Sequence, residues 1–276
     1  MTGKEKTLIK GFIFYPILTF LVIIVNYPYL WMVLTSLKSK KEVFMFPPDL
    51  IPKTFLWQNY IEAWNAAIWP RYFLNSVIAS IIPAFSQVFL GSLAAYAFTK
   101  KFRGSQILFY IFLGTLMIPP QATMIPNYVI IKNFGWLDTY YALIAPFLCS
   151  AFGVFLLRQF FLTIPKELED AAIIDGCSSF RYLFEIVLPL STPALLTVGL
   201  FAFMGQWNDF LWPLVVTNKD EMRVVQVGLA VFQSEWTTEW SHLMAACTFS
   251  SIPLIVAFLF VQRKFIEGVA LSGLKR

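Results

Sequence analysis

The ionisable residues with the most suggestive spacing lie in one polar stretch, Pro165 to Pro189, between two long apolar runs. A proline presets the first position of a helix, acids in the first turn complement the helix dipole, and Gly176 can end the helix. The pattern predicts a short helix over Pro165 to Gly176 with the small Ala171 and Ala172 on it. Its acids are Glu167, Glu169, Asp170 and Asp175. Such a surface suits charge pairing with a basic partner protein.

The second half of this stretch turns an apolar stripe back toward the following apolar run. The stripe has helical spacing, which predicts a second helix and so a hairpin over about residues 163–190. Its residues are Phe180, Leu183, Phe184 and Val187. Alternatively, the acids of the Pro165 to Gly176 helix form a charged surface that is simply exposed to solvent.

Catalytic groups are absent from the rest of the sequence. No phosphate-binding G-x-x-x-x-G-K-[ST] loop occurs, His242 is the only histidine, and the three cysteines have no metal or redox spacing. The net charge of +5 is spread over loops on opposite sides of the expected membrane, which suggests no nucleic-acid partner. We therefore expect no enzyme activity, no bound metal and no cofactor held by this chain.

The composition indicates that these groups are positioned by a membrane protein. Hydrophobic residues make up 58% and charged residues 13% of the chain, against about 25% charged in soluble proteins. A helical span needs about 20 apolar residues, and six charge-free runs meet this. They are Gly11–Leu37, Tyr72–Thr99, Gly104–Ile131, Thr139–Leu157, Ile186–Asn208 and Leu243–Gln262. We predict one all-α integral membrane domain over residues 1–276, with six spans centred near residues 22, 86, 115, 149, 204 and 253.

The third run is the least regular, because Pro119, Pro120 and Pro126 fall in its second half. Proline interrupts a helix. We therefore expect a span over roughly Ile107–Met124, followed by a segment at the membrane interface.

Basic residues flank the runs unevenly, and they gather on the cytoplasmic side of membranes. The clusters lie at the N-terminus, after the second run and after the sixth. They include Lys4, Lys6, Lys10, Lys100, Lys101, Arg103, Arg263, Lys264, Lys275 and Arg276. This predicts a multi-pass protein of the cell membrane with both termini in the cytoplasm. The acidic hairpin then lies in the cytoplasm, where cations are normally favoured.

Three polar residues, Gln206, Asn208 and Asp209, are expected in the second half of the fifth span. At 1.5 Å per residue, Asp209 is about 24 Å along the helix from Pro193, in the outer leaflet. An ionisable residue at that depth must face protein or water. The three residues therefore line a solute pathway or form a structural hydrogen bond to another helix. Weaker candidates of the same kind are Asn75, Gln87, Gln121 and Asn127.

The polar stretch also carries a family resemblance. Asp170-Ala171-Ala172, then Gly176, Ile186 and Leu188-Pro189, resembles the E-A-A loop of permease subunits of ABC importers. The flanking residues and Trp207-Asn208-Asp209-Phe210 are similar to the carbohydrate-uptake branch, and most to its smaller maltose-type permeases. Asp170 departs from the pattern, since the family usually has Glu there.

The resemblance implies a permease for a sugar, an oligosaccharide or a related polyol. Its implied partners are a sister permease, two ATPase subunits that use ATP, an extracellular or periplasmic solute-binding protein and membrane lipid. The outer loop from Thr217 to Ser241 would meet the binding protein. The implied ATPase-coupling residues are Glu169, Asp170, Ala171, Ala172, Asp175, Gly176, Leu188 and Pro189. The alternatives are a permease for a non-sugar solute such as a glycerol-phosphate, and an ion-coupled secondary transporter.

Overall fold

The computed structural model describes residues 3–233 and 237–273. Within these ranges the chain forms helices and no strand, apart from one isolated bridge between Gln233 and Thr238. Three helices are long and apolar enough to cross a membrane, and three bent helix pairs bring the described spans to as many as six. The all-α fold predicted from the sequence is confirmed.

The chain divides into two compact units. The first contains Met1–Ala67 and Leu229–Ile252, and the second contains Ile68–Gly228 and Pro253–Arg276. The long helix α15 (Trp240–Gly273) contributes residues to both.

The first unit holds α1 (Gly3–Ser36), α2 (Lys40–Val43), α3 (Gln58–Asn65) and the short η5 (Leu229–Phe232). Ser39 and Glu42 form a capping box at the start of α2. The ring nitrogens of His242 lie 2.9 Å from carboxylate oxygens of Glu62 and Glu239, which links α15 to α3.

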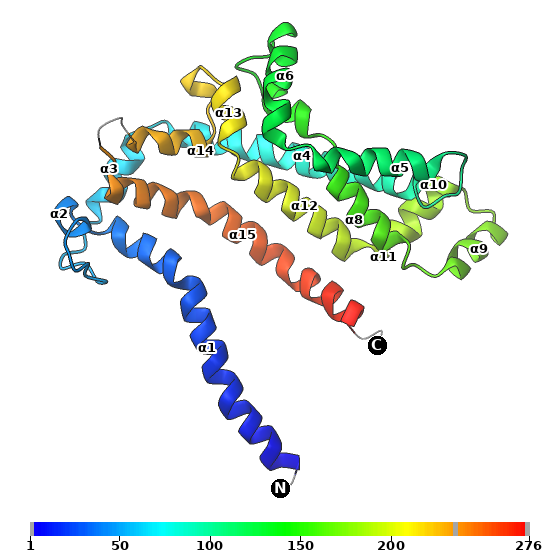
Figure 1. The fold of residues 1–276 in the computed structure, drawn as a ribbon, viewed down its shortest axis with the longest axis horizontal. Coiled ribbons are helices and arrows are strands. Elements are labelled where there is room, and N and C mark those ends of the chain that lie inside the picture. The colour runs from blue at the N-terminus through cyan, green and yellow to red at the C-terminus, as the bar shows by residue number, and fades with distance from the viewer. Residues whose placement is uncertain (1–2, 234–236, 274–276) are drawn as a thin grey trace. The chain divides into compact units, whose positions relative to one another are not determined.

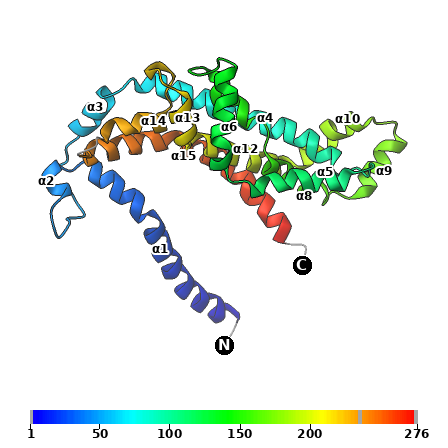
Figure 2. The same ribbon diagram turned by 45° about the horizontal axis from the view of Figure 1, so that its top comes forward.

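The second unit is built on three helices that run alongside one another, α4 (Trp69–Ala97), α8 (Ala151–Phe161) and α12 (Thr192–Trp207) (Figures 1 and 2). Small residues let them approach. A Cβ placed on Gly91 would meet Leu157 of α8 at 3.5 Å, and one on Gly199 would meet Val88 at 3.3 Å. This core sets the positions of the loops at both ends of α4.

The third predicted span is shorter than expected. A helical segment of α5 (Ser105–Gly114) and η1 (Thr115–Met117) ends at Met117, and α6 (Pro120–Asn133) leaves it at 97°. The predicted end at Met124 was therefore wrong, although a break was expected. The cause is Pro119, because a residue before proline is driven out of the helical region. Ile118 has ψ 116°.

The fourth predicted span is also bent. It consists of α7 (Tyr140–Ile144) with η2 (Ala145–Phe147), followed at 41° by α8. Ser150 stands before α8, and its hydroxyl accepts a hydrogen bond from the Gly153 N–H at 3.4 Å. The break falls near residue 149, the predicted centre of this span.

The fifth predicted span is broken at Ser191. The segments before it are α10 (Ser179–Tyr182), the π-helical η3 (Leu183–Val187) and α11 (Leu188–Leu190), and α12 continues at 80° to them. Helix α12 ends at Trp207, so Asn208 and Asp209 lie past the helix and not within it as predicted. The Asp209 carboxylate instead accepts the Trp212 N–H at 3.4 Å, at the start of α13 (Leu211–Val216). Two short elements complete the unit, η4 (Asp220–Met222) and α14 (Val225–Gly228).

Candidate functional site

The acidic segment forms α9 (Lys166–Ile174), which lies beyond the C-terminal end of α4 in both ribbon views (Figures 1 and 2). The helix begins at Lys166, so Pro165 is its N-cap residue and not its first helical residue as expected. Gly176 ends the segment with φ 73°. The Gly176 N–H donates to Ile173 O at 3.0 Å and the Cys177 N–H to Ala172 O at 2.8 Å. These two bonds form a Schellman motif, in which a residue with positive φ satisfies the last helical carbonyls.

The two alanines of α9 face in different directions. Ala172 is buried in a cluster that includes Tyr182 and Leu183, so it fixes the helix to the rest of the hairpin. Ala171 is exposed. The neighbouring Ile173 and Ile174 are 62% and 85% exposed. Large apolar side chains therefore lie exposed beside the acids of α9.

The adjacent acids Glu169 and Asp170 also differ. Glu169 forms an ion pair with Lys100, which follows α4, and both side chains are 33% exposed. Burial alone would lower the pKa of the Lys100 ammonium, but the hydrogen bond to Glu169 and the contact with Tyr96 outweigh it and raise the pKa above its ordinary value. Lys100 therefore stays charged and holds Glu169 against the chain. Asp170 is exposed and pairs with none of the described residues.

The remaining predicted coupling residues lie in the same hairpin. Asp175 is the C-terminal cap of α9 and is exposed. Leu188 packs against the cluster around Ala172, and Pro189 is exposed at the bend before α12. The structure thus brings all eight together at one end of the second unit.

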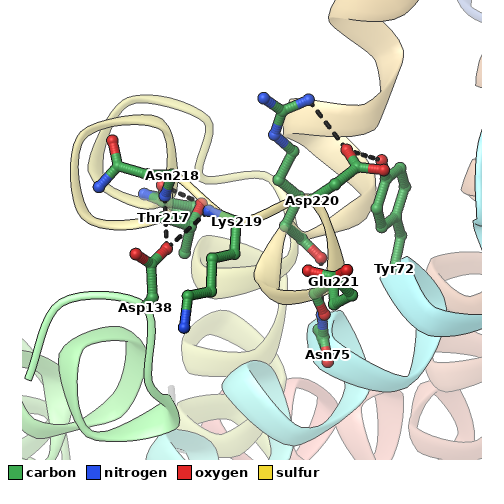
Figure 3. Close-up of polar contacts among 10 residues, drawn as sticks. Tyr72, Asn75, Asp138, Thr217, Asn218, Lys219, Asp220 and Glu221 are labelled. Atoms are coloured by element: carbon green, nitrogen blue, oxygen red, sulfur yellow. Dashed lines mark hydrogen bonds and ion pairs between the residues drawn. The ribbon is translucent and has the colours of Figure 1, made fainter.

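A hydrogen-bonded network that the sequence did not predict lies at the opposite end of α4 (Figure 3). Asn75 is fully buried, and its amide nitrogen donates to the carbonyls of Glu221 and Arg223, each at 2.8 Å. Its amide oxygen accepts from the Tyr140 hydroxyl at 2.7 Å. One side chain therefore fixes the loop around η4 and the start of α7 together.

Neighbouring residues of α4 hold the same loop. The Tyr72 hydroxyl donates to Asp220 at 2.6 Å, and the Ser76 hydroxyl accepts the Val225 N–H at 2.9 Å. Asp138, with φ 57°, accepts the N–H groups of Asn218 and Lys219 on one carboxylate oxygen (Figure 3). The loop presents the exposed side chains of Asn218, Lys219, Asp220 and Glu221 on a rigid base.

We expect Asn75→Leu to loosen this loop. Each buried carbonyl left without its donor costs about 1–3 kcal/mol. The variant should unfold at a lower temperature, and the loop after Thr217 should be cut faster by protease. Asn218→Ala is the matched control, because only the Asn218 backbone takes part in the network. Equal cleavage in the two variants would contradict a positioning role for Asn75.

The three predicted pathway residues are distributed over two cavities and the surface. Gln206 lines a cavity of about 290 Å³, and Asp209 lines a second of about 140 Å³ together with Gln121 and Asn127. Asn208 is exposed, lies outside both, and donates to Met204 O at 2.9 Å. Among the described residues no group of His, Cys, Asp and Glu could hold a metal ion.

Comparison with known proteins decides the family. Residues 87–270 match the family described as the binding-protein-dependent transport system inner membrane component. The chain belongs to this family. It is a permease of the ABC importer type.

The relatives match this permease over nearly its whole length. An ABC transporter permease protein of Bacillus subtilis, YurM, is 37% identical over 257 residues, covering 92% of this chain and 85% of its own length. The arabinooligosaccharides transport permease AraQ of Bacillus subtilis is 31% identical, with 90% of each chain covered. The sn-glycerol-3-phosphate transport permease UgpE of Rhizobium meliloti is 33% identical, covering 96% of this chain and 98% of its own length.

A solved structure supports the fold independently. The crystal structure of a bacterial ABC transporter involved in the import of the acidic polysaccharide alginate contains a chain that matches with a TM-score of 0.79. The identity is 22%, and the match covers 96% of this permease and 99% of that chain.

Proposed function

We propose that this permease forms half of the translocation pathway of an ATP-driven importer for a sugar, an oligosaccharide or a related polyol. The other half is a sister permease, and two cytoplasmic ATPase subunits and a solute-binding protein complete the importer. ATP is used by the ATPases, while this chain itself is not an enzyme and holds no cofactor. It works as one transmembrane domain over residues 1–276, with the coupling hairpin at about residues 163–190.

The observation that carries the proposal is the surface of α9. It combines an outward acid, Asp170, with exposed Ile173 and Ile174 on a helix fixed from behind by Ala172 and by the ion pair of Glu169 with Lys100. A helix held in this way would move as a rigid body together with the ATPase that binds it. Closure of the ATPases would therefore reorient the attached spans between inward and outward access, a rearrangement between two discrete packings.

The orientation follows from the same assignment. If α9 contacts cytoplasmic ATPases, both termini lie in the cytoplasm and the network around Asn75 lies on the outer side. The loop from Thr217, of which residues 234–236 are outside the described residues, then faces the binding protein. Gln206 and Asp209, which line cavities, serve the solute pathway, whereas Asn208 lies beside it.

The carbohydrate class is supported by the relatives of known substrate, which include permeases named for arabinooligosaccharides. Permeases named for sn-glycerol 3-phosphate match about equally well, which keeps a glycerol-phosphate as the second candidate.

The test is uptake by the complete importer, reconstituted in liposomes with its ATPases, sister permease and binding protein. We expect ATP-dependent uptake of labelled arabinotriose that stops when the binding protein is omitted. Uptake of sn-glycerol 3-phosphate alone would select the second candidate. Uptake without ATP or ATPase subunits would contradict the proposal and favour an ion-coupled transporter.

A further inference from the structure

The larger of the two cavities opens where the fourth span is broken. Its volume of about 290 Å³ is close to the lower limit of small-molecule sites, about 300 Å³. Its walls come from α4, α8 and α12 and from the break itself, and they include Gln87, Cys149, Ser150 and Gln206. The smaller cavity shares Pro146 and Phe147 with it, so the two adjoin.

The break leaves backbone carbonyls outside a regular helix, and side chains of α4 bond two of them. Non-helical backbone within a membrane is tolerated where it is buried in protein or lines a water-filled cavity. Here Gln87 donates to the Phe147 carbonyl and Ser86 to the Leu148 carbonyl, each at 2.8 Å. These bonds stabilise the break from the α4 side. On its other side the break faces the cavity.

Gln206 is the polar group in this cavity that the protein does not use. It is half-buried, and its side chain makes no hydrogen bond to any described residue. An amide inside a membrane protein needs a partner, because lipid tails offer none. Counted along α12 from Thr192, Gln206 is about 21 Å from the start of the helix, well inside a hydrocarbon core about 30 Å thick.

The remaining lining suits a molecule with hydroxyl groups and apolar faces. Phe152 and Phe201 line the cavity in an edge-to-face pair, with ring centroids 6.1 Å apart. Gln87 and Ser150 add polar atoms on the opposite elements. Apolar and aromatic walls with a few placed polar groups are typical of small-molecule sites.

We propose that this cavity binds one sugar unit of the passing solute, with Gln206 as the residue that hydrogen-bonds its hydroxyl groups. The inference rests on the proposed carbohydrate function and adds a direct solute contact by this chain. Gln206 sets affinity for the solute in transit, and the smaller cavity beside Asp209 continues the path.

Cys149 offers a direct test, because it is exposed and lines the cavity. The complete importer is prepared with Cys177→Ala and Cys247→Ala, and with partner subunits free of cysteine, so that Cys149 is the thiol that reacts. The rate of labelling by a small charged methanethiosulfonate reagent is measured with and without arabinotriose, and with sn-glycerol 3-phosphate as a second arm. We expect arabinotriose to slow the labelling.

Gln206→Ala should remove this protection and raise the KM for arabinotriose uptake by about two- to tenfold, the loss of one or two neutral hydrogen bonds. Gln106→Ala is the matched control, since the Gln106 amide is already bonded to the Tyr110 hydroxyl at 2.9 Å. It should leave both the KM and the protection unchanged.

The outcomes separate this inference from the proposed function. If wild-type importer does not take up arabinotriose or any other sugar, the carbohydrate function itself fails. If it takes up arabinotriose but Cys149 is not protected and Gln206→Ala leaves the KM unchanged, only the binding site is overturned. Cys149 that never reacts would mean that the sister permease fills the cavity, which also overturns it.

Discussion

Asp170→Ala is expected to release the ATPase from the purified permease, whereas Glu169→Ala should leave most of it bound. Asp170 is exposed and forms no ion pair with the described residues, whereas Glu169 is engaged with Lys100. Removing one member of a desolvated charge pair between proteins costs about 2–5 kcal/mol, which is at least about 30-fold in affinity. Retention of the ATPase on immobilised permease measures the difference. Asp170→Glu, which restores the usual family residue, should bind as well or slightly better.

The internal ion pair supplies the control. Lys100→Ala and Glu169→Ala break the same contact. Each should therefore weaken ATPase binding by a similar small amount, about 1 kcal/mol or less for a largely solvated pair. The double variant should be no worse than either single one, because the two residues are coupled. If Glu169→Ala released the ATPase and Asp170→Ala did not, the assignment of the outward acid would be wrong.

Gly176→Val should uncouple ATP hydrolysis from uptake. No atom lies within 4 Å of a Cβ placed on Gly176, so the substitution meets no steric clash. The difficulty is the backbone, because a φ of 73° costs an ordinary residue about 1–2 kcal/mol and a β-branched one more. The Schellman motif would open, and α9 would lose its fixed end. When ATPase activity and solute uptake are measured together in liposomes, ATP should be hydrolysed without matching uptake of solute.

Gly176→Asn is the matched control, because asparagine tolerates positive φ better than other residues with a side chain. It adds polar bulk at the same place but should keep uptake coupled to hydrolysis. If both variants uncouple, the ATPase contacts Gly176 directly and added volume is the cause. If neither does, the ending of α9 has no part in coupling.

The acidic hairpin could be predicted from the sequence because its determinants are local. A proline before the helix, acids in its first turn and a glycine after it act within about ten residues, and the structure reproduces each of them. The number of spans is also a local property, because each depends on one apolar run. Helix ends depend on single residues, and Pro119 ended the third span earlier than predicted.

The network around Asn75 could not be predicted in this way. Asn75 and Glu221 are 146 residues apart in the sequence. The amide nitrogen of Asn75 bonds to backbone carbonyls, which every residue type carries, so no sequence pattern indicates these bonds. A buried asparagine could be suspected at Asn75, but Asp138 and Asp220 resemble ordinary loop acids until the fold brings them to the end of α4. The cavity at residue 149 was missed because an apolar run does not reveal where its helix breaks.

Helix α4 has a consequence for how force crosses the membrane. Asn75, in the first turns of this helix, anchors the loop around η4, and Lys100, just past its last turn, holds α9. Between Asn75 and Ala97 lie about 33 Å of helix, so a tilt of about 10° at one end displaces the other by about 6 Å. Pro83 removes one internal hydrogen bond along the way and provides a place to bend. In the proposed importer this helix would act as a lever arm, and its stiffness would determine how far a movement of α9 displaces the loop around η4.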